Sequence, residues 1–480
     1  MASAPKNIFK HSVPVPRIYK VASKVAANLK AGKDSLKNLV YQEKHVNIKT
    51  LYALIVETFK RDQIISDLIE KSQLLVKEPR FNPWLAKILI CEMLWGKNKM
   101  KGDSKPVQTI LGYQQLLKKL LNDCNDAPKN VLLHHVSKPR YVRVNTLKIT
   151  VEEAVNNFKD EGWTFVPFLN KFDYEGFLTR MDNLEPHEFM TDLHISDLLI
   201  FPPKTEFYRH EAYKSRNIIL QDKASCLPVH LLNPTPGSIV MDMCAAPGMK
   251  TTQLAAMLKD SGTVHAVELD RNREKILREF VDSAGATCVK TILKDVMKVT
   301  DKDCPGIEYI LVDPSCSGSG ITDRVEIEDY DLQNKILRLR KLCAFQAKLL
   351  RYALTSFPQA KRVVYSTCSV NSEENEDVVR QVLETCKDFK LVDARKTLKS
   401  WNDSGSIVFP ELGKMCVYAS PEKDKTNGFF VAVLERLKEG EKNPYLNVQL
   451  LKMFDKAFRD GTRKNREKGK GEERHKLIKK

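Results

Sequence analysis

The sequence predicts an α/β protein with three parts: an all-helical N-terminal domain, a small α+β subdomain and a larger, Rossmann-like domain built on a parallel sheet. Residues 16 to about 125 place their apolar side chains at helical spacing. From Pro139 the pattern changes to an alternating strand, a helix and a second strand. From Gly237 to Arg436 short apolar runs alternate with amphipathic segments of helix length, which is typical of a parallel sheet with helices on both faces.

The N-terminal part consists of several amphipathic segments. An apolar stripe from Ile18 to Leu29 predicts a first helix that ends before Gly32, although an acid-free, amphipathic start is also typical of a mitochondrial transit peptide. Further helices are predicted by "NIKTLYALIVETFKR", "NPWLAKILICEMLWGK" and "ILGYQQLLKKLL", with Pro83 near the start of the second. We therefore expect a helical N-terminal domain over residues 1–130.

The middle part begins with "PRYVRVNTLKIT", whose side chains alternate as those of a strand do. The helix-like "TVEEAVNNFKDEG" and the strand "WTFVPF" follow it. We expect a small α+β, RNA-binding-like subdomain over residues 131–215. Arg140, Arg143 and Lys148 are candidates for contacts with phosphates, and ordinary surface charges on a half-exposed strand are the alternative.

The third part supplies the strands of the parallel sheet. They are predicted by "SIVMDM", "TVHAVEL", "ATCVKTIL", "EYILVD" and "RVVYST", and "GFFVAVLER" predicts a final strand. We expect this Rossmann-like domain over residues 216–437 and a basic C-terminal tail over residues 438–480. Ligands of such sheets bind beyond the carboxyl ends of the strands, so the loops there are the place to search for a site.

The composition favours an intracellular protein with a polyanionic partner. The formal net charge is +17, and most of it comes from the two ends, residues 1–33 and residues 461–480. Solvated tails, direct RNA contact and nuclear addressing all remain possible explanations of these ends. The chain has eleven cysteines without a C-x-x-C pair, so we expect reduced thiols and no metal site. No apolar run is long enough to span a membrane, and we expect a soluble monomer.

A loop of small residues, "DMCAAPGMKTTQLAAML", follows the first strand of the sheet and opens a helix. Small side chains and Gly248 let the backbone approach a ligand, and the helix start offers free N–H groups. A dinucleotide-binding loop needs three glycines, and a P-loop needs glycine and lysine where this chain has Met243 and Met249. An adenosyl ligand without a polyphosphate remains. Glu268, which lies 20 residues beyond Gly248, can accept hydrogen bonds from its ribose, and the pattern suggests S-adenosylmethionine.

Five motifs occur together in an order and spacing that are more specific than any one of them: "ILQDKAS", "DMCAAPGMKT", "VDPSCSGSG", "YSTCS" and "GFFVAV". With these motifs the chain resembles the Nol/Nop/Sun family of RNA cytosine-C5 methyltransferases over about residues 50 to 436. "YVRVNTLK" and the helical N-terminus look most like the large-subunit ribosomal RNA methyltransferase branch of that family. The resemblance implies that the Rossmann-like domain is an S-adenosylmethionine-dependent methyltransferase domain.

The resemblance also implies a set of residues for the methyl donor. The loop that would hold the donor comprises Cys244, Ala245, Ala246, Pro247, Gly248, Met249 and Lys250. The residues that would complete the site are Glu268, Arg273, Asp295 and Asp313. Glu268 stands where the family commonly has aspartate, which keeps the chemistry and lengthens the reach slightly.

Two cysteines lie in similar turns after apolar strands, Cys316 in "VDPSCSGSG" and Cys368 in "VVYSTCS". In the strand order of methyltransferases these two strands are neighbours, so we expect the two thiols to meet at one site. Asn371 and Glu374 suit the N-cap and third position of a following helix, whose start would lower the pKa of Cys368.

Methylation of cytosine at C5 explains why two thiols would be needed. A thiolate that adds to C6 turns the ring into an enamine whose C5 can attack a sulfonium methyl group. The C5 proton and the thiol must then leave, and a separate base helps this step, directly or through water. The helix start favours Cys368 as the nucleophile, and the resemblance agrees and assigns Cys316 to product release. Asp313 could hydrogen-bond the cytosine edge or the amino group of the donor.

The sequence therefore predicts an RNA cytosine-C5 methyltransferase with RNA as its partner. The resemblance points to large-subunit ribosomal RNA and to the nucleolus. Two alternatives remain: a DNA cytosine-C5 methyltransferase, in which the cysteine of the earlier turn is the nucleophile, and a catalytically silent ribosome-assembly protein that binds RNA.

Overall fold

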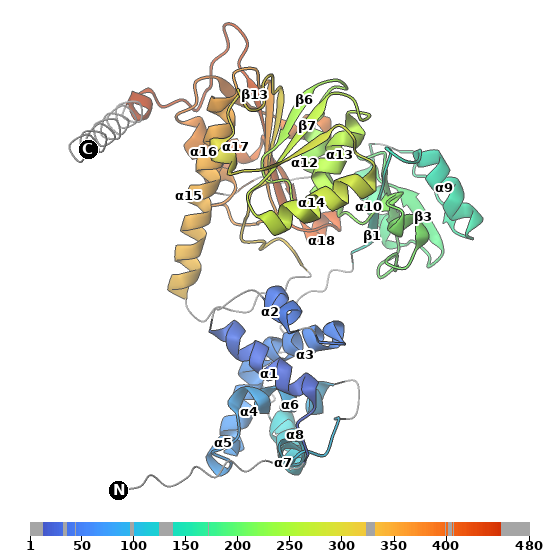
Figure 1. Ribbon diagram of the computed structural model, residues 1–480, viewed down its shortest axis with the longest axis vertical. Helices are drawn as coiled ribbons and strands as arrows, with labels where there is room; N and C mark the ends of the chain where they lie inside the picture. The colour runs from blue at the N-terminus through green and yellow to red at the C-terminus, as the bar shows by residue number, and fades with distance from the viewer. Residues whose placement is uncertain are drawn as a thin grey trace, which may run out of the picture. The chain divides into compact units, whose positions relative to one another are not determined.

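The structure is a computed structural model that describes residues 13–31, 36–43, 45–96, 100–123, 138–170, 172–322, 332–398, 400–401, 406 and 408–452. The chain forms two compact units, Met1–His135 with Val325–Leu332 and Val136–Arg324 with Gln333–Lys480 (Figure 1). The basic end at residues 461–480 lies outside the described residues.

The first unit is helical in all of its described elements. These are α1 (Arg17–Lys30), α2 (Leu36–Gln42), α3 (Ile48–Lys60), α4 (Asp62–Lys71), α5 (Leu74–Lys77), α6 (Pro83–Trp95), α7 (Lys105–Gly112) and α8 (Gln114–Asp123). The predicted stripe of α1 is confirmed, since Val21, Ala22 and Val25 are buried in the core of this unit. Pro83 is the first residue of α6, where a missing N–H costs nothing, and Asn82 caps that helix by accepting from the Leu85 N–H at 2.9 Å.

The second unit begins with the small α+β subdomain. Its elements are β1 (Arg140–Val144), α9 (Val151–Asp160), β2 (Thr164–Phe165), α10 (Tyr174–Asp182), β3 (Glu188–Thr191), β4 (Leu198–Phe201), α11 (Glu211–Lys214) and β5 (Ile218–Ile219). The strands form a sheet in the order β2-β3-β4-β1-β5. Thr150 and Glu153 form a capping box at the start of α9, which is why that helix begins directly after the first strand and its turn.

The larger sheet of this unit has the order β11-β13-β10-β9-β6-β7-β8, with β12 paired to β13. The strands are β6 (Ile239–Asp242), β7 (Thr263–Glu268), β8 (Val289–Leu293), β9 (Tyr309–Val312), β10 (Arg362–Thr367), β11 (Phe389–Val392), β12 (Val417–Ala419) and β13 (Phe429–Arg436). Strands β6 to β10 are parallel, and β13 runs antiparallel to β10, β11 and β12. The parallel strands therefore all end at one edge.

Helices cover both faces of this sheet. Alternate side chains of its strands accordingly belong to two separate cores. Val364 of β10 belongs to a core with residues of α12, α13 and α14, while Val363 and Tyr365 belong to another with residues of α15 and α16. The helices and 3-10 turns are α12 (Lys223–Leu232), α13 (Met249–Met257), α14 (Arg271–Ala284), η1 (Val296–Lys298), α15 (Leu332–Ser356), α16 (Glu376–Leu383), η2 (Ala394–Thr397), α17 (Pro410–Gly413) and α18 (Pro421–Asp424). The fold class predicted from the sequence is confirmed (Figure 1).

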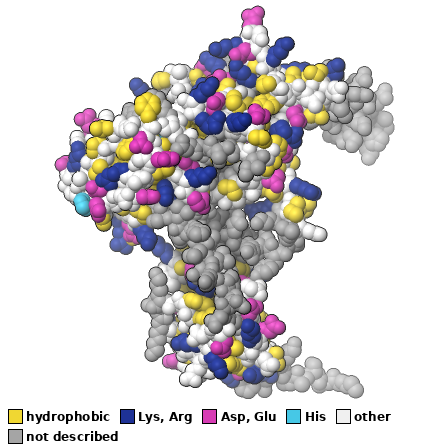
Figure 2. Space-filling model, turned by 180° about the vertical axis from the view of Figure 1, so that it is seen from behind, with side chains coloured by type: hydrophobic (Ala, Val, Ile, Leu, Met, Phe, Trp, Pro, Cys, Tyr) yellow, Lys and Arg dark blue, Asp and Glu magenta, His cyan; other side chains and the backbone are white. Residues whose placement is uncertain are grey.

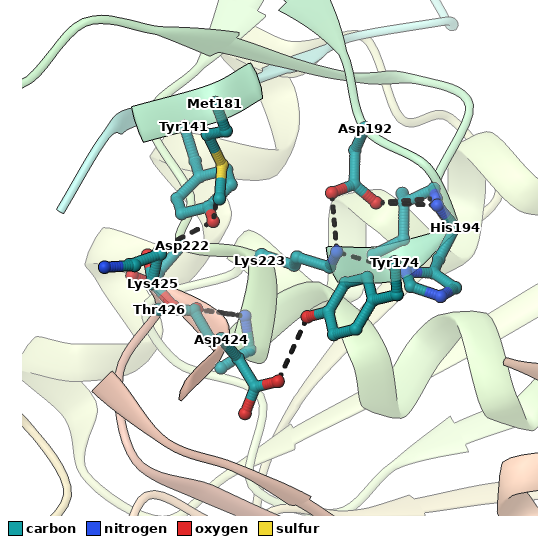
Figure 3. Close-up of polar contacts among 12 residues, drawn as sticks. Tyr141, Tyr174, Met181, Asp192, His194, Asp222, Lys223, Asp424, Lys425 and Thr426 are labelled. Carbon is teal, nitrogen blue, oxygen red and sulfur yellow. Dashed lines mark hydrogen bonds and ion pairs between the residues drawn. The ribbon is translucent and has the colours of Figure 1, made fainter. Parts of the chain in front are cut away.

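A buried polar cluster joins the α+β subdomain to the sheet domain (Figure 3). The Nζ of Lys223, at the start of α12, lies 2.7 Å from Oδ2 of Asp192, which follows β3. Burial alone would raise the pKa of Asp192, but the Lys223 ammonium holds it below its ordinary value. Nearby, the hydroxyl of Tyr174 donates to Asp424 at 3.1 Å. Because these four side chains are buried, water does not compete for their bonds, and the bonds hold the subdomain on the sheet domain.

The basic side chains predicted to contact phosphates are not equivalent. Arg140 is exposed, and the Lys148 ammonium donates to the Ser215 carbonyl at 2.7 Å. Arg143 is fully buried and donates to the Met249 carbonyl and the Thr252 hydroxyl at the start of α13, so its prediction as a phosphate contact is wrong. Figure 2 shows Lys and Arg side chains interspersed with Asp and Glu side chains on the face that it draws.

Candidate active site

The loop between β6 and α13 lines a small pocket at the carboxyl edge of the sheet. Backbone bonds hold the loop to both neighbouring strands, from the Met243 N–H to the Leu311 carbonyl and from the Ala245 N–H to the Val267 carbonyl, each at 3.0 Å. The pocket is lined by Asp242, Cys244, Ala245, Ala246, Pro247, Met249, Lys250 and Asp313. Six of the seven predicted loop residues therefore face this pocket, and Asp313 joins them from the end of β9.

Gly248, the seventh loop residue, has a structural role that the sequence did not reveal. Its φ of 110° lies in the left-handed region that side chains rarely adopt, and it is the N-cap of α13. A Cβ at this position would lie 3.1 Å from Cδ1 of Leu277 and 3.2 Å from Cδ1 of Phe280, both on α14. Glycine is therefore favoured by the left-handed backbone, and a side chain here would also press on Leu277 and Phe280 of α14.

Glu268 and Arg273 are brought to the same loop. The Oε1 of Glu268 accepts from the N–H groups of Leu269 and Asp270, at 2.9 and 3.0 Å. The Arg273 guanidinium lies 3.4 Å from the other carboxylate oxygen of Glu268 and donates to the Ala246 carbonyl at 2.8 Å. The end of β7 and the loop from Cys244 to Lys250 are thus tied together by one arginine.

Asp295 lies at the end of the next strand, β8, and is half-buried. Its carboxylate caps η1 by accepting from the Met297 N–H at 3.1 Å. Within the described part of the chain it makes no hydrogen bond to the loop from Cys244 to Lys250, so its place in the site stays a prediction.

The two predicted cysteines are in contact. The turns that carry them follow β9 and β10, which pair directly, and the Sγ atoms of Cys316 and Cys368 lie 2.9 Å apart. The hydrogen bond between the thiols raises the pKa of Cys316 and lowers the pKa of Cys368 below its ordinary value. Cys316 therefore keeps its proton and donates it, while Cys368 is the thiol that ionises.

A partly buried ion pair lies beside these thiols. The Lys250 ammonium is 2.8 Å from Oδ2 of Asp313, whose other oxygen accepts from the Ser366 hydroxyl at 2.7 Å. Burial disfavours the charged form of Lys250, but the Asp313 carboxylate raises its pKa overall. The positive charge of Lys250 also helps to lower the pKa of Cys368, which places a cation, a thiolate and the pocket side by side.

The predicted helix cap after Cys368 is wrong. Helix α16 begins at Glu376 with Asn375 as its N-cap residue, and Asn371 and Glu374 lie in the turn before it. The Glu374 side chain accepts from groups of both cysteine turns instead of capping a helix. The low pKa of Cys368 therefore comes first from Cys316, with Lys250 contributing, rather than from a helix start as predicted.

Asp242 is a site residue that the sequence reasoning missed, although an acid at the end of "SIVMD" was a visible signal. It is buried, it accepts from the Thr251 hydroxyl at 2.8 Å, and it lines the pocket beside Lys250 and Asp313. Burial raises the pKa of Asp242 from 3.8 to about 6.

The raised pKa of Asp242 predicts a pH-dependent stability. Because the folded protein holds this proton more tightly than the unfolded chain, stability from this group is greatest below pH 3.8 and falls as the pH rises to about 6. The loss amounts to about 3 kcal/mol. We expect Asp242→Asn to gain melting temperature relative to the wild type between pH 4 and pH 7, measured by calorimetry. A difference that does not change over this range would contradict the assignment.

Two kinds of feature are absent from the described residues. No group of three or more His, Cys, Asp or Glu side chains is placed to hold a metal ion among them. None of the described helices combines the length and the apolarity that a membrane span requires.

Comparisons with family models cover most of the chain. Residues 229–435 match the model described as 16S rRNA methyltransferase RsmB/F. Residues 138–221 match the ferredoxin-like domain of NOL1/NOP2/Sun domain family member 5, and residues 49–126 match the N-terminal domain of the same family member.

Curated relatives match over nearly their whole length. A 28S rRNA (cytosine-C(5))-methyltransferase of Drosophila melanogaster is 38% identical, over 90% of this chain and 99% of the relative. A protein of the same name from Mus musculus is 38% identical, over 87% of this chain and 91% of the relative. Among solved structures, a methyltransferase homologue from Pyrococcus horikoshii has a TM-score of 0.50 and 23% identity, over 76% of this chain and 99% of that one, which shows the fold alone.

Proposed function

Because the chain belongs to the NOL1/NOP2/Sun domain family, we propose that it transfers a methyl group from S-adenosylmethionine to C5 of a cytosine in large-subunit ribosomal RNA. It is an RNA cytosine-C5 methyltransferase. The observation that carries the proposal is the contact of 2.9 Å between the thiols of Cys316 and Cys368 beside a pocket that holds Lys250 and Asp313. This chemistry needs a nucleophile and a separate group for release, and the site offers one of each.

The residues around the pocket fit the methyl donor. The small side chains of Ala245 and Ala246 leave the backbone open to a ligand, and the buried Glu268 is a carboxylate acceptor for ribose hydroxyls. The carboxylates of Asp242 and Asp313 make the pocket suitable for the positively charged groups of the donor. When bound, S-adenosylmethionine supplies a methyl group on a positively charged sulfur. We assign donor binding to the loop from Cys244 to Lys250 with Glu268, Arg273, Asp295 and Asp313.

The two thiols act in sequence in this proposal. The Cys368 thiolate forms a bond to C6 of the cytosine, and the ring electrons move to C5, which then takes the methyl group. Afterwards the C5 proton leaves, the electrons return to the ring, and the bond between C6 and Cys368 breaks. Once Cys368 is bonded to C6 it is no longer the thiolate that holds the proton of Cys316 in place, so Cys316 loses this proton to water and then takes up the C5 proton, directly or through water. The hydrogen bond from Cys316, with help from the charge of Lys250, holds Cys368 ionised before the first step, and Asp313 orients Lys250.

The RNA species and the compartment are the finer part of the proposal. Both relatives described above carry the name of a 28S rRNA methyltransferase, which supports large-subunit ribosomal RNA as the substrate of this chain. Methylation of that RNA during ribosome assembly would place the protein in the nucleolus. We propose that it acts there as a monomer.

A methyl-transfer assay tests the function directly. We expect the purified protein to transfer labelled methyl groups to extracted ribosomal RNA and not to DNA, and bisulfite sequencing of the product to show protection at one cytosine of the large-subunit RNA. Transfer to DNA would favour a DNA cytosine-C5 methyltransferase. The absence of any transfer to ribosomal RNA would favour a silent assembly factor.

A further inference from the structure

Glu374 is a buried carboxylate between the two turns that carry the thiols. Its side chain is fully buried, and it reaches the turn after β9 as well as the turn after β10. Neither the loop for the methyl donor nor the pocket contains it. An ionised carboxylate in such a place costs free energy unless hydrogen-bond donors surround it, so its partners indicate what it is for.

Four donors surround the carboxylate and come from three segments. The Oε1 of Glu374 accepts from the Ser317 N–H at 2.8 Å and from Nε2 of Gln346, on α15, at 2.9 Å. Its Oε2 accepts from the Ser369 hydroxyl at 2.6 Å and from Nδ2 of Asn371 at 3.1 Å. Ser317 directly follows Cys316 and Ser369 directly follows Cys368, so one carboxylate bridges the neighbours of both thiols.

The surroundings keep Glu374 ionised and fixed. Burial alone would raise the pKa of Glu374, but its hydrogen bonds, from Ser317 and Ser369 above all, hold it below the ordinary value. Its backbone carbonyl accepts from the buried hydroxyl of Tyr365 at 2.6 Å. The carboxylate is therefore anchored at both ends, and charge-assisted bonds of this kind are stronger than neutral ones.

We propose that Glu374 is a positioning residue that holds the turns of Cys316 and Cys368 at the separation at which the two thiols share a hydrogen bond. The positioning role itself does not depend on the proposed function. Only the role of the contact between the thiols in methyl transfer rests on it. Since the contact between the thiols is what makes Cys368 the ionised partner, loosening the two turns weakens the nucleophile without touching it.

The donor pattern makes Glu374→Gln a sharp test. All four partners donate, and an amide can accept at only one of its two positions. The Ser317 N–H cannot reverse its role, so the amide oxygen must face it, and the amide nitrogen then faces the donors of Ser369 and Asn371. The Ser369 hydroxyl can turn and accept from that nitrogen, but the Asn371 NH₂ group only donates. The substitution therefore keeps size and shape while it removes the negative charge and the bond from Asn371 in the Cys368 turn.

Glu376→Gln is the matched control. Glu376 is a second buried glutamate two residues further on, and its Oε1 accepts from the Tyr418 hydroxyl at 2.7 Å. In the described structure it makes no hydrogen bond to either cysteine turn. Both variants therefore lose one buried negative charge in the same part of the fold, and only one of them loses the bridge.

The measurement is the rate at which iodoacetamide alkylates Cys368 as a function of pH, followed by peptide mass spectrometry on the intact chain. The groups that act on this thiol are Cys316, Asp313 and Lys250, and neither variant changes them. We expect Glu374→Gln to raise the apparent pKa of Cys368 by about one unit, and so to slow its alkylation near neutral pH by about tenfold. Glu376→Gln is expected to follow the wild type. In methyl transfer, Glu374→Gln should lower kcat and leave KM for S-adenosylmethionine unchanged.

The outcomes separate this inference from the proposed function. If the wild type transfers no methyl group but Glu374→Gln still slows alkylation selectively, the inference stands and the function fails. If Cys368 titrates alike in the wild type and in both variants, the inference is overturned, whatever the enzyme activity. Should Glu374→Gln not fold, Ser369→Ala removes the shortest bond to the carboxylate and keeps its charge. A Cys368 pKa unchanged in that variant would equally overturn the inference.

Discussion

Cys368→Ala is expected to bind RNA and S-adenosylmethionine yet to transfer no methyl group and to leave no covalent adduct with RNA. The reason is that Cys368 is the thiol whose pKa is lowered, by Cys316 and by Lys250, so its loss removes the nucleophile. Methyl transfer from labelled S-adenosylmethionine and denaturing electrophoresis of the mixture with RNA measure the two effects. Trapping of RNA by Cys368→Ala would reverse the two roles and favour the arrangement of the DNA enzymes.

Cys316→Ala provides the complementary result. This variant loses the hydrogen bond that lowers the pKa of Cys368, so Cys368 adds to the base more slowly, but Lys250 still favours its thiolate. Release of product is expected to slow more, by about 10²- to 10⁴-fold, which is the range for loss of a general base. A protein–RNA adduct should therefore accumulate and survive denaturing electrophoresis. The double variant should lose that adduct, because addition precedes release. If neither single variant traps RNA while both stay active, the contact between the thiols is only packing.

Gly248→Val is expected to abolish S-adenosylmethionine binding, as measured by titration calorimetry. Valine at a φ of 110° is strained, and its side chain would collide with Leu277 and Phe280 of α14, so the donor loop must move. Such overpacking typically costs about 1–3 kcal/mol of folding stability as well.

Gly162→Val is the matched control for this experiment. Gly162 has a φ of 96°, and an added Cβ there meets nothing within 4 Å. Valine at this position is under a similar backbone strain, but it lies far in sequence from the loop of Cys244 to Lys250. The Gly162→Val variant should therefore lose some stability and keep its affinity for S-adenosylmethionine. Unchanged affinity in Gly248→Val would show that this loop does not hold the donor.

Sequence patterns of a few neighbouring residues predicted the loop at the pocket correctly and the helix cap after Cys368 wrongly. The loop from Cys244 to Lys250 could be predicted because small residues between a strand and a helix are a local pattern. Six of its seven residues, all but Gly248, line the pocket. The cap at Asn371 was predicted wrongly because the pattern of residues 371–374 also suits a cap. In the structure the Glu374 side chain instead accepts hydrogen bonds from Ser317 and Gln346, which are 57 and 28 residues away along the chain.

The sequence by itself determined the order of the elements, the two cysteine turns and the loop of small residues at the pocket, because hydrophobic period and turn residues act over a few residues. Only the tertiary structure decided that Arg143 is buried against α13 rather than free for phosphates, and that the two cysteines touch. Which of them ionises depends on a hydrogen bond across 52 residues of chain and on the charge of Lys250. Such contacts follow from the parallel pairing of β9 with β10, and no local pattern encodes the distance between two side chains on different strands.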